Sequence, residues 1–580
     1  MKKRTAFFAA LTLGLIFLIQ HSLKKLNLPD LQETTLRLAI DDKIESLDPA
    51  KAYSDDSLFV SSQVLETLFQ YHYLKRPYEL QPLLAEDFPE ISQNGRVIKI
   101  KIKKNIFYHP HEAFGGIKRE LIAEDFVVQF KRIALESLQS PGRGLFLGLI
   151  EGFSEYGEKV GNNWMSINSQ KLSGVTSEDT HTLIIKLLNN DPNIIYYLSL
   201  NFISPMPWEL VEHYSNNFNN VLIGTGPYIF HEMKKDRIVM KKNQIYREDF
   251  YPTSGDRYAN LGKLLDSSKE KIPFIDNLSF EISGNEGVRW QKFLKKEVDI
   301  LSVPKTYIPE LFGENRELNP ELKDRDVVLK HFPAMANRWL AFNMRNPILG
   351  KNVNLRKAIA HSIDFSQYIK LLSLNTSLRA NSLLVPGIAG YSPAKDFRYK
   401  YDLNLAKEYL RKAGYDSHEK MPRITYSTRG NQGISIEEGN FIKKQLEAIG
   451  LIVDLQVLTF PDFLKKGRAG ELMFFTDNWL FDYPNAENIL QLLLSTNAPG
   501  INKSGYFSPK VDELYLKLKE TNNLDKRDAI ISEIEEIIFR DVPWIPLMYE
   551  SSFILHYPEI KNFRESSIIR NYIKYLKIEK

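Results

Sequence analysis

Short strand-like segments and amphipathic helical segments alternate along this chain from about residue 35 to its end. Apolar residues occupy every second position in 36–40 and 98–102, which is the spacing of a half-buried strand. In 126–133 and 442–449 they recur at three- or four-residue intervals, which places them on one face of a helix. Repeated alternation of this kind predicts an α/β protein whose cores are built around sheets.

Turn and capping residues mark where these segments begin and end. Asn94-Gly95 predicts a hairpin turn, Asp402 the cap of a helix that ends at Gly414, and Ser508-Pro509 the start of another helix. No Gly/Ser-rich linker divides the chain, although 580 residues are far more than one ordinary core needs. We therefore predict two or three packed lobes whose segments are interleaved in the sequence.

Charge and cysteine content exclude several classes of function. The 76 basic and 72 acidic residues give a net charge of +4, and the basic residues are scattered, which argues against a nucleic-acid partner. Aromatic residues make up 12% of the chain, which suits a cleft that holds flexible ligands by apolar contact. Because the chain has no cysteine, disulfides, thiolate metal sites and lipid attachment through an N-terminal cysteine are excluded.

The N-terminus has the features of an export signal. Lys2, Lys3 and Arg4 form a positive segment, and residues 6–19 form an apolar run that is short for a spanning helix. No small-residue cleavage site follows the run. We therefore expect residues 1–33 to comprise a signal peptide or a retained N-terminal anchor with a spacer, and the rest of the chain to be periplasmic.

Local catalytic signatures are missing from the sequence. It contains no G-x-S-x-G elbow, no phosphate-binding loop and no H-E-x-x-H. His109-Pro110-His111 could chelate a metal, but two histidines without further partners are more often surface residues. We expect no catalytic residues, no metal site and no cofactor, although catalytic groups can also come from distant segments.

A series of short motifs follows a fixed order along nearly the whole chain after residue 35. The motifs include Leu47-Asp48-Pro49-Ala50, Gly224-Thr225-Gly226-Pro227-Tyr228, Val385-Pro386-Gly387, Trp479-Leu480-Phe481-Asp482-Tyr483-Pro484 and Val542-Pro543-Trp544-Ile545-Pro546-Leu547. In this order they resemble family 5 of the extracellular solute-binding proteins, the peptide receptors of ABC importers.

The resemblance implies a two-lobe periplasmic-binding-protein fold of the type II-like kind, in its large peptide-binding cluster. Residues 34–330 would form lobe I, with an extra subdomain at about 77–202. Residues 331–545 would form lobe II, and 546–580 would return to lobe I. The chain would cross between the lobes twice, and the ligand would bind in the cleft between them.

The resemblance also suggests three ligand-binding residues. Asp482 matches the aspartate that receives a peptide ammonium in peptide-binding relatives, Trp479 would wall the same pocket, and Tyr549 would line the cleft. The alternatives are an ordinary turn or capping role for Asp482 and plain core packing for Trp479. Burying a free ammonium without an acceptor is unfavourable, which is why a fixed carboxylate suits this ligand.

The function that follows is a monomeric substrate-binding component, which would deliver peptide-like solutes to ABC importer permease subunits. It would contact the membrane only through its N-terminal segment or the permease. Another cargo, such as a metal–chelator complex or an opine, is an alternative. So are a secreted peptide hydrolase and a tethered sensor or chaperone.

Overall fold

The computed structural model describes residues 33–40, 44–313, 317–394, 396–431, 433–498, 500–521 and 523–579. The expected signal peptide or anchor therefore lies outside the described residues, apart from Glu33. In the part of the chain that is described, no helix is both long and apolar enough to cross a membrane.

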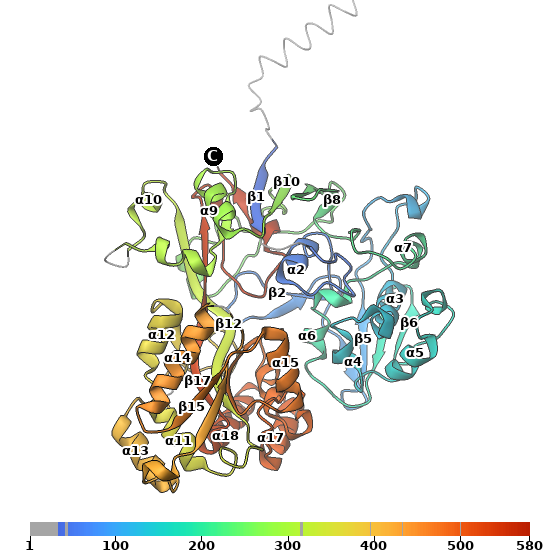
Figure 1. Cartoon of the computed structure of the whole chain (residues 1–580). Coiled ribbons are helices and arrows are strands. Elements are labelled where there is room, and N and C mark those ends of the chain that lie inside the picture. The colour runs from blue at the N-terminus through green and yellow to red at the C-terminus, as the bar shows by residue number, and fades with distance from the viewer. Residues whose placement is uncertain are drawn as a thin grey trace, which may run out of the picture.

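One sheet extends through both halves of the molecule. Its two longest strands, β12 (Val328–Phe342) and β17 (Trp544–His556), pair antiparallel and carry the chain between the halves (Figure 1). The other strands are β1 (Thr35–Ile40), β8 (Tyr228–Met233), β9 (Arg237–Lys242), β10 (Asn277–Ile282), β11 (Ile300–Ser302), β13 (Leu378–Arg379), β14 (Arg423–Ser427), β15 (Ile452–Gln456) and β16 (Phe474–Leu480). The strand order is β15-β14-β16-β12-β17-β11-β1-β10-β9-β8, with β13 paired to β17.

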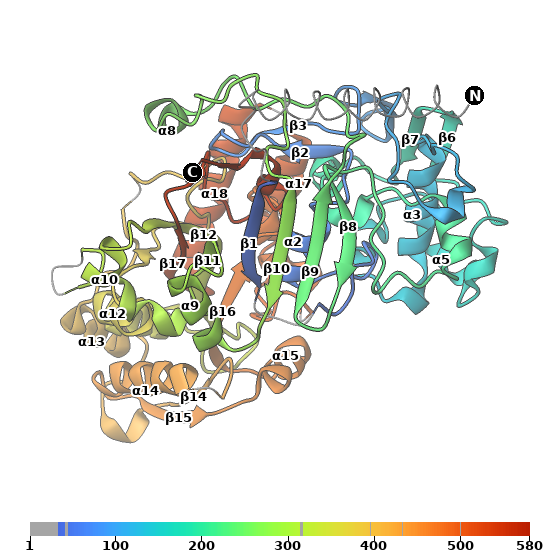
Figure 2. The same ribbon diagram turned by 90° about the horizontal axis from the view of Figure 1, so that it is seen from above.

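The fold is thus a two-lobe α/β architecture of the type II-like kind, as predicted. Lobe I contains β11, β1, β10, β9 and β8, in that order, and the last four stand side by side in Figure 2. Lobe II contains β16, β14 and β15 with a shell of helices. These helices are α11 (Val353–Ser362), α12 (Phe365–Ser373), α13 (Leu403–Lys412), α14 (Gly433–Glu447), α15 (Phe460–Ala469), α17 (Pro509–Glu520) and α18 (Leu524–Asp541).

A separate four-stranded sheet forms the extra part of lobe I. Its strands are β4 (Glu90–Ser92), β5 (Val97–Lys101), β7 (Thr182–Lys186) and β6 (Val175–Asp179), in that order, and α3 (Ala123–Ala134) packs against them. The hydrophobic core of this subdomain includes side chains from Ala50 to Phe218. Within it, Arg132 and Asp48 form an ion pair of 2.7 Å whose side chains are both 0% exposed.

The turn and capping residues act as the sequence predicts. Asn94 and Gly95 turn the chain between β4 and β5 with φ of 55° and 87°. The Asp402 side chain accepts backbone N–H groups at the start of α13, and Ser508 does the same at the start of α17. Helix α13 ends slightly before Gly414, which adopts φ of 91° as expected for a residue after a helix.

The ladder between β12 and β17 is irregular in its middle. Its register shifts between Pro333 and Asn337 and again between Arg338 and Trp339. The predicted lobe boundaries at 330/331 and 545/546 fall inside these two strands, each of which is continuous. The boundaries remain predictions, because each is a point on a strand that both lobes share.

Candidate ligand-binding cleft

Two adjoining chambers lie between the lobes. Chamber one has a volume of about 490 Å³ and is lined by lobe I, its subdomain and the C-terminal tail. Chamber two has a volume of about 550 Å³ and is lined mainly by lobe II. Tyr53, Leu480 and Asp482 line both chambers, so these three residues mark where the chambers meet. Volumes of this size suit a small organic ligand.

Asp482 stands at this junction, two residues after the end of β16. Its carboxylate is open to the cleft, and none of the described lysines, arginines or histidines forms an ion pair with it. Partial desolvation by the surrounding cleft residues raises the pKa of the Asp482 carboxyl above its ordinary value, while the Asn488 amide and the charge of Arg570 act in the opposite direction. A carboxylate without a cationic partner, partly desolvated in a cleft, is a candidate acceptor for a cationic ligand group.

Asn488 fixes the geometry around Asp482. This asparagine is fully buried in the short helix α16 (Glu487–Leu490). Its Nδ2 donates to Asp482 Oδ2 at 3.2 Å, and its Oδ1 accepts from the Asp482 backbone N–H at 3.2 Å. The same oxygen accepts from Trp479 Nε1 at 2.7 Å. One side chain therefore holds both Trp479 and Asp482, the two residues of this segment that the resemblance suggests for the site.

Trp479 lies on chamber two and packs partly buried against the lobe II core. Its position fits the predicted wall of the pocket and also the alternative of core packing, since the ring does both. The two roles are compatible because Trp479 sits near the end of β16, where the strand leaves the core and reaches the cleft.

Tyr549 lies away from both chambers. Its side chain is only 1% exposed, and its hydroxyl donates to Asn381 Oδ1 at 3.0 Å. The same hydroxyl accepts the backbone N–H groups of Asn381 and Ser382. These contacts join β17 to the segment after β13, so we give Tyr549 a packing role and leave it out of the proposed site.

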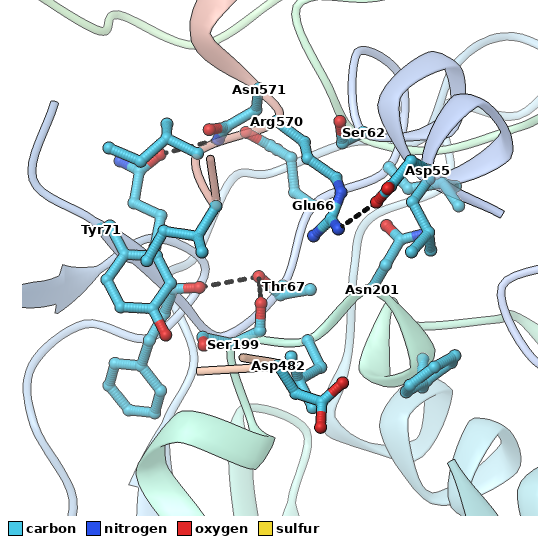
Figure 3. Close-up of a pocket in the computed structure, with 18 of the residues that line it drawn as sticks. Asp55, Ser62, Glu66, Thr67, Tyr71, Ser199, Asn201, Asp482, Arg570 and Asn571 are labelled. Carbon is cyan, nitrogen blue, oxygen red and sulfur yellow. Dashed lines mark hydrogen bonds and ion pairs between the residues drawn. The ribbon is translucent and has the colours of Figure 1, made fainter. Parts of the chain in front are cut away.

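Chamber one carries its own ion pair. Arg570, from the C-terminal tail, contacts Asp55 at 2.7 Å, and Asp482 lies below this pair in the view of Figure 3. Asp55 belongs to α2 (Asp55–Ser61). Glu66 also lines the chamber, but it is buried and is held by Arg247, whose Nη1 approaches it to 2.7 Å. Sequence reasoning did not find Arg570, which lies 88 positions beyond Asp482.

Lobe II also contacts the subdomain directly beside the cleft. Tyr483, the neighbour of Asp482, is 2% exposed and stacks on Tyr196 with ring centroids 5.6 Å apart. Lys519 on α17 forms an ion pair with Asp191 at 2.8 Å. The turn that carries Asp482 is therefore bound to both lobes at once.

The histidines considered from the sequence take different positions. His109 is buried rather than at the surface, and its Nε2 lies 3.0 Å from the carbonyl oxygen of Gly226. His111 lies near two other residues that could bind a metal ion: potential ligand atoms of His111, Glu112 and His213 all lie within 4.8 Å of one another. However, His111 Nδ1 accepts a hydrogen bond from the Ala113 backbone N–H, so Nδ1 carries no proton and a neutral ring carries its proton on Nε2. Nε2 would have to lose that proton before it could bind a metal.

Two α/β lobes joined by shared strands, with an open cavity between them, are the architecture of a solute-binding protein that closes around its ligand. The chain belongs to the bacterial extracellular solute-binding proteins, family 5. The model of that family, described as "Bacterial extracellular solute-binding proteins, family 5 Middle", matches residues 79–500. The resemblance noted in the sequence is thereby confirmed, and the members of this family are binding proteins rather than enzymes.

Individual relatives are distant but cover most of the chain. Di/tripeptide-binding protein 2 of Pseudomonas aeruginosa is 24% identical over 92% of this chain and 93% of its own. Heme-binding protein A of Haemophilus influenzae is 22% identical over 87% of this chain and 85% of its own. The periplasmic binding protein DppA from Helicobacter pylori, solved with the peptide STSA, has a TM-score of 0.69 and 22% identity, and covers 94% of this chain and 99% of its own.

Proposed function

We propose that this chain is the periplasmic receptor of an ATP-driven importer and that it binds short peptides with a free amino terminus. The observation that carries the proposal is Asp482, a carboxylate without a cationic partner among the described residues, at the junction of two chambers between the lobes. Relatives that are named for dipeptides and for di- and tripeptides support the choice of ligand.

The peptide ammonium would bind to the Asp482 carboxylate, which has no cationic partner among the described residues. A charge-assisted hydrogen bond in a closed, water-poor cleft is among the stronger polar contacts a protein can make. Asn488 donates a hydrogen bond to Oδ2 of the carboxylate, so the acceptor is already oriented before the ligand arrives. Less conformational freedom is then lost on binding, which favours affinity.

The other end of the ligand would meet the cations of chamber two. Arg429 and Lys503 line this chamber, at 3.2 Å and 2.6 Å from Asp477. A peptide whose amine is at Asp482 can place its terminal carboxylate against Arg429, where a planar guanidinium can bind both carboxylate oxygens. Asp482 and the cations beside Asp477 thus offer a partner to each end of a peptide, and the chamber volumes suit a ligand of a few residues.

Partners and location follow from the same role. The protein would work as a monomer, would present its closed form to permease subunits, and would be placed in the periplasm by the segment of residues 1–33. We propose no chemical turnover of the ligand. Incubation with a bound peptide should return that peptide intact, whereas a peptide hydrolase would release smaller products.

Calorimetry tests whether Asp482 binds the peptide ammonium, with a free and an N-acetylated dipeptide each titrated into the original protein and the Asp482→Ala variant. Asp482→Ala should weaken binding of a free dipeptide by about 2–5 kcal/mol, or 30-fold and more, because the ammonium is left without its acceptor. The N-acetylated dipeptide should bind the original protein poorly and lose little on substitution. Asp482→Asn serves as the matched variant, since it keeps the shape and removes the charge.

If Asp482→Ala weakens the affinity for both peptides equally, Asp482 shapes the pocket and does not bind the ammonium. A different cargo, such as a metal–chelator complex, an opine or heme, is the second candidate, because one relative is named for heme. Mass spectrometry of the ligand that copurifies with the protein separates these cargoes. A ligand without a primary amine would refute the peptide assignment.

A further inference from the structure

The side chains that line chamber two carry one more positive charge than negative charge. Arg429 and Lys503 both pair with Asp477, whose side chain is 6% exposed. Arg468, near the end of α15, lines the same chamber, and no ion pair joins it to any described residue. Three cations and two carboxylates, Asp477 and Asp482, therefore line chamber two, and Asp482 is the carboxylate that forms no ion pair with any of the described cations.

A simple zwitterionic peptide leaves this surplus in place. Its ammonium neutralises Asp482, and its terminal carboxylate neutralises one cation beside Asp477. One cation then remains without a partner when the lobes close and exclude water. Since an uncompensated charge in a desolvated site is unfavourable, a ligand with one more negative group fits the chamber better.

The walls of the chamber strengthen this preference. Trp339 and Trp544 stack with centroids 4.2 Å apart on its floor, and the Arg429 guanidinium lies 4.7 Å from the centre of the Phe460 ring. Aromatic walls exclude water and keep the local dielectric low, so charges attract one another more strongly than in solvent. Arg468 itself is exposed and can reorient towards a ligand.

We propose that chamber two selects short peptides with an acidic side chain at the carboxyl-terminal residue, and that Arg468 is the partner of this side chain. This inference rests on the proposed function. It adds the class of peptide, since the ligand would carry a net charge of −1 where a neutral zwitterion would otherwise suffice.

Calorimetry with Ala-Ala, Ala-Gln and Ala-Glu tests the proposal on the full exported protein. Ala-Glu should bind about tenfold more tightly than Ala-Gln, since the two side chains match in size and differ in one charge. Arg468→Gln should remove this difference, so that Ala-Glu and Ala-Gln bind the variant about equally. Arg411→Gln, at an exposed arginine on α13 away from both chambers, is the matched control and should keep the difference.

The terminal carboxylate and the acidic side chain are distinguished by amidation. Ala-Glu with an amidated terminus should bind more weakly than Ala-Glu and still prefer the original protein to the Arg468→Gln variant. Equal binding of Ala-Glu and Ala-Gln, with Ala-Ala binding intact, would overturn the selectivity and leave the proposed function standing. Failure of all three peptides to bind would overturn both.

Discussion

Asn488 offers the most informative single substitution in the cleft. Asn488→Leu keeps the approximate volume of the side chain but removes the donor to Asp482 and the acceptor for Trp479 Nε1. The buried hydrogen bonds that are lost should lower the free energy of unfolding by about 1–3 kcal/mol. The protein should still fold, because this amount is a fraction of the stability expected for a chain of this size.

The effect on binding follows from the freedom that Asp482 regains. Fixing one side chain on binding takes about 0.5–1.5 kcal/mol, which corresponds to a loss of roughly threefold to tenfold in affinity for a free dipeptide. The pH dependence should change as well. Because the Asn488 amide lowers the pKa of the Asp482 carboxyl, its removal raises this pKa further, and the loss of affinity on acidification should begin at a higher pH.

Calorimetry over a pH series measures both effects. The N-acetylated peptide should be nearly insensitive to Asn488→Leu, since it does not use the carboxylate. Asn343→Leu is the matched control: Asn343 is a buried asparagine of lobe II that donates to the Gly470 and Leu472 carbonyls and lines neither chamber. Full affinity and an unchanged pH profile for Asn488→Leu would refute the positioning role.

Three further substitutions test the rest of the structure. Lys519→Met removes the ion pair with Asp191 between the lobes and should weaken peptide binding about two- to fivefold by calorimetry; unchanged affinity would mean that the pair does not favour closure. Arg132→Met leaves Asp48 buried and unpaired and should lower the free energy of unfolding by about 3–5 kcal/mol in denaturant titrations, with much of the loss recovered by adding Asp48→Leu. Burial lowers the pKa of His109 from 6.5 to about 4, so the unfolded chain binds the extra proton between these values and acidification through this range should remove about 3 kcal/mol of stability. His109→Gln should flatten that part of the pH–stability curve, and an equally steep curve in the variant would contradict this assignment.

Local sequence patterns predict many of the turns and helix ends of the fold. The Asn94-Gly95 turn and the caps at Asp402 and Ser508 each depend on residues within a few positions, and all three appear in the structure. The order of the motifs then gave the two-lobe architecture through resemblance. The chain reversals that place β17 beside β12 could not follow from periodicity alone, since that pairing joins residues about 200 positions apart.

The candidate site was only partly accessible from the sequence. Trp479 and Asp482 were found because they share one short motif on one strand end. Asn488 carries no signature of its own and acts only through a helix that folds back on the motif. Arg468 comes from a different helix, and its relevance lies in a charge count that needs the assembled chamber.

Tyr549 lies on β17, which runs between the lobes, and this position is the reason to predict that it lines the cleft. Residues along a strand alternate between its two faces, and Tyr549 faces the segment that contains Asn381 and Ser382. Membership of the connecting strand therefore does not decide which side a residue presents.

The pairing of β11 with β17 affects the order in which the protein can fold. Strands β1, β8, β9, β10 and β11 are all complete by residue 302, whereas β17 begins at Trp544. During synthesis or translocation from the N-terminus, the outer edge of β11 therefore has no partner until almost the whole chain has emerged. An open strand edge is prone to pair with other chains, and contacts between distant segments form slowly. The end of β17, residues 554–556, thus closes the edge of a lobe whose other strands are made much earlier, and a chain that stops before β17 would retain an unprotected edge.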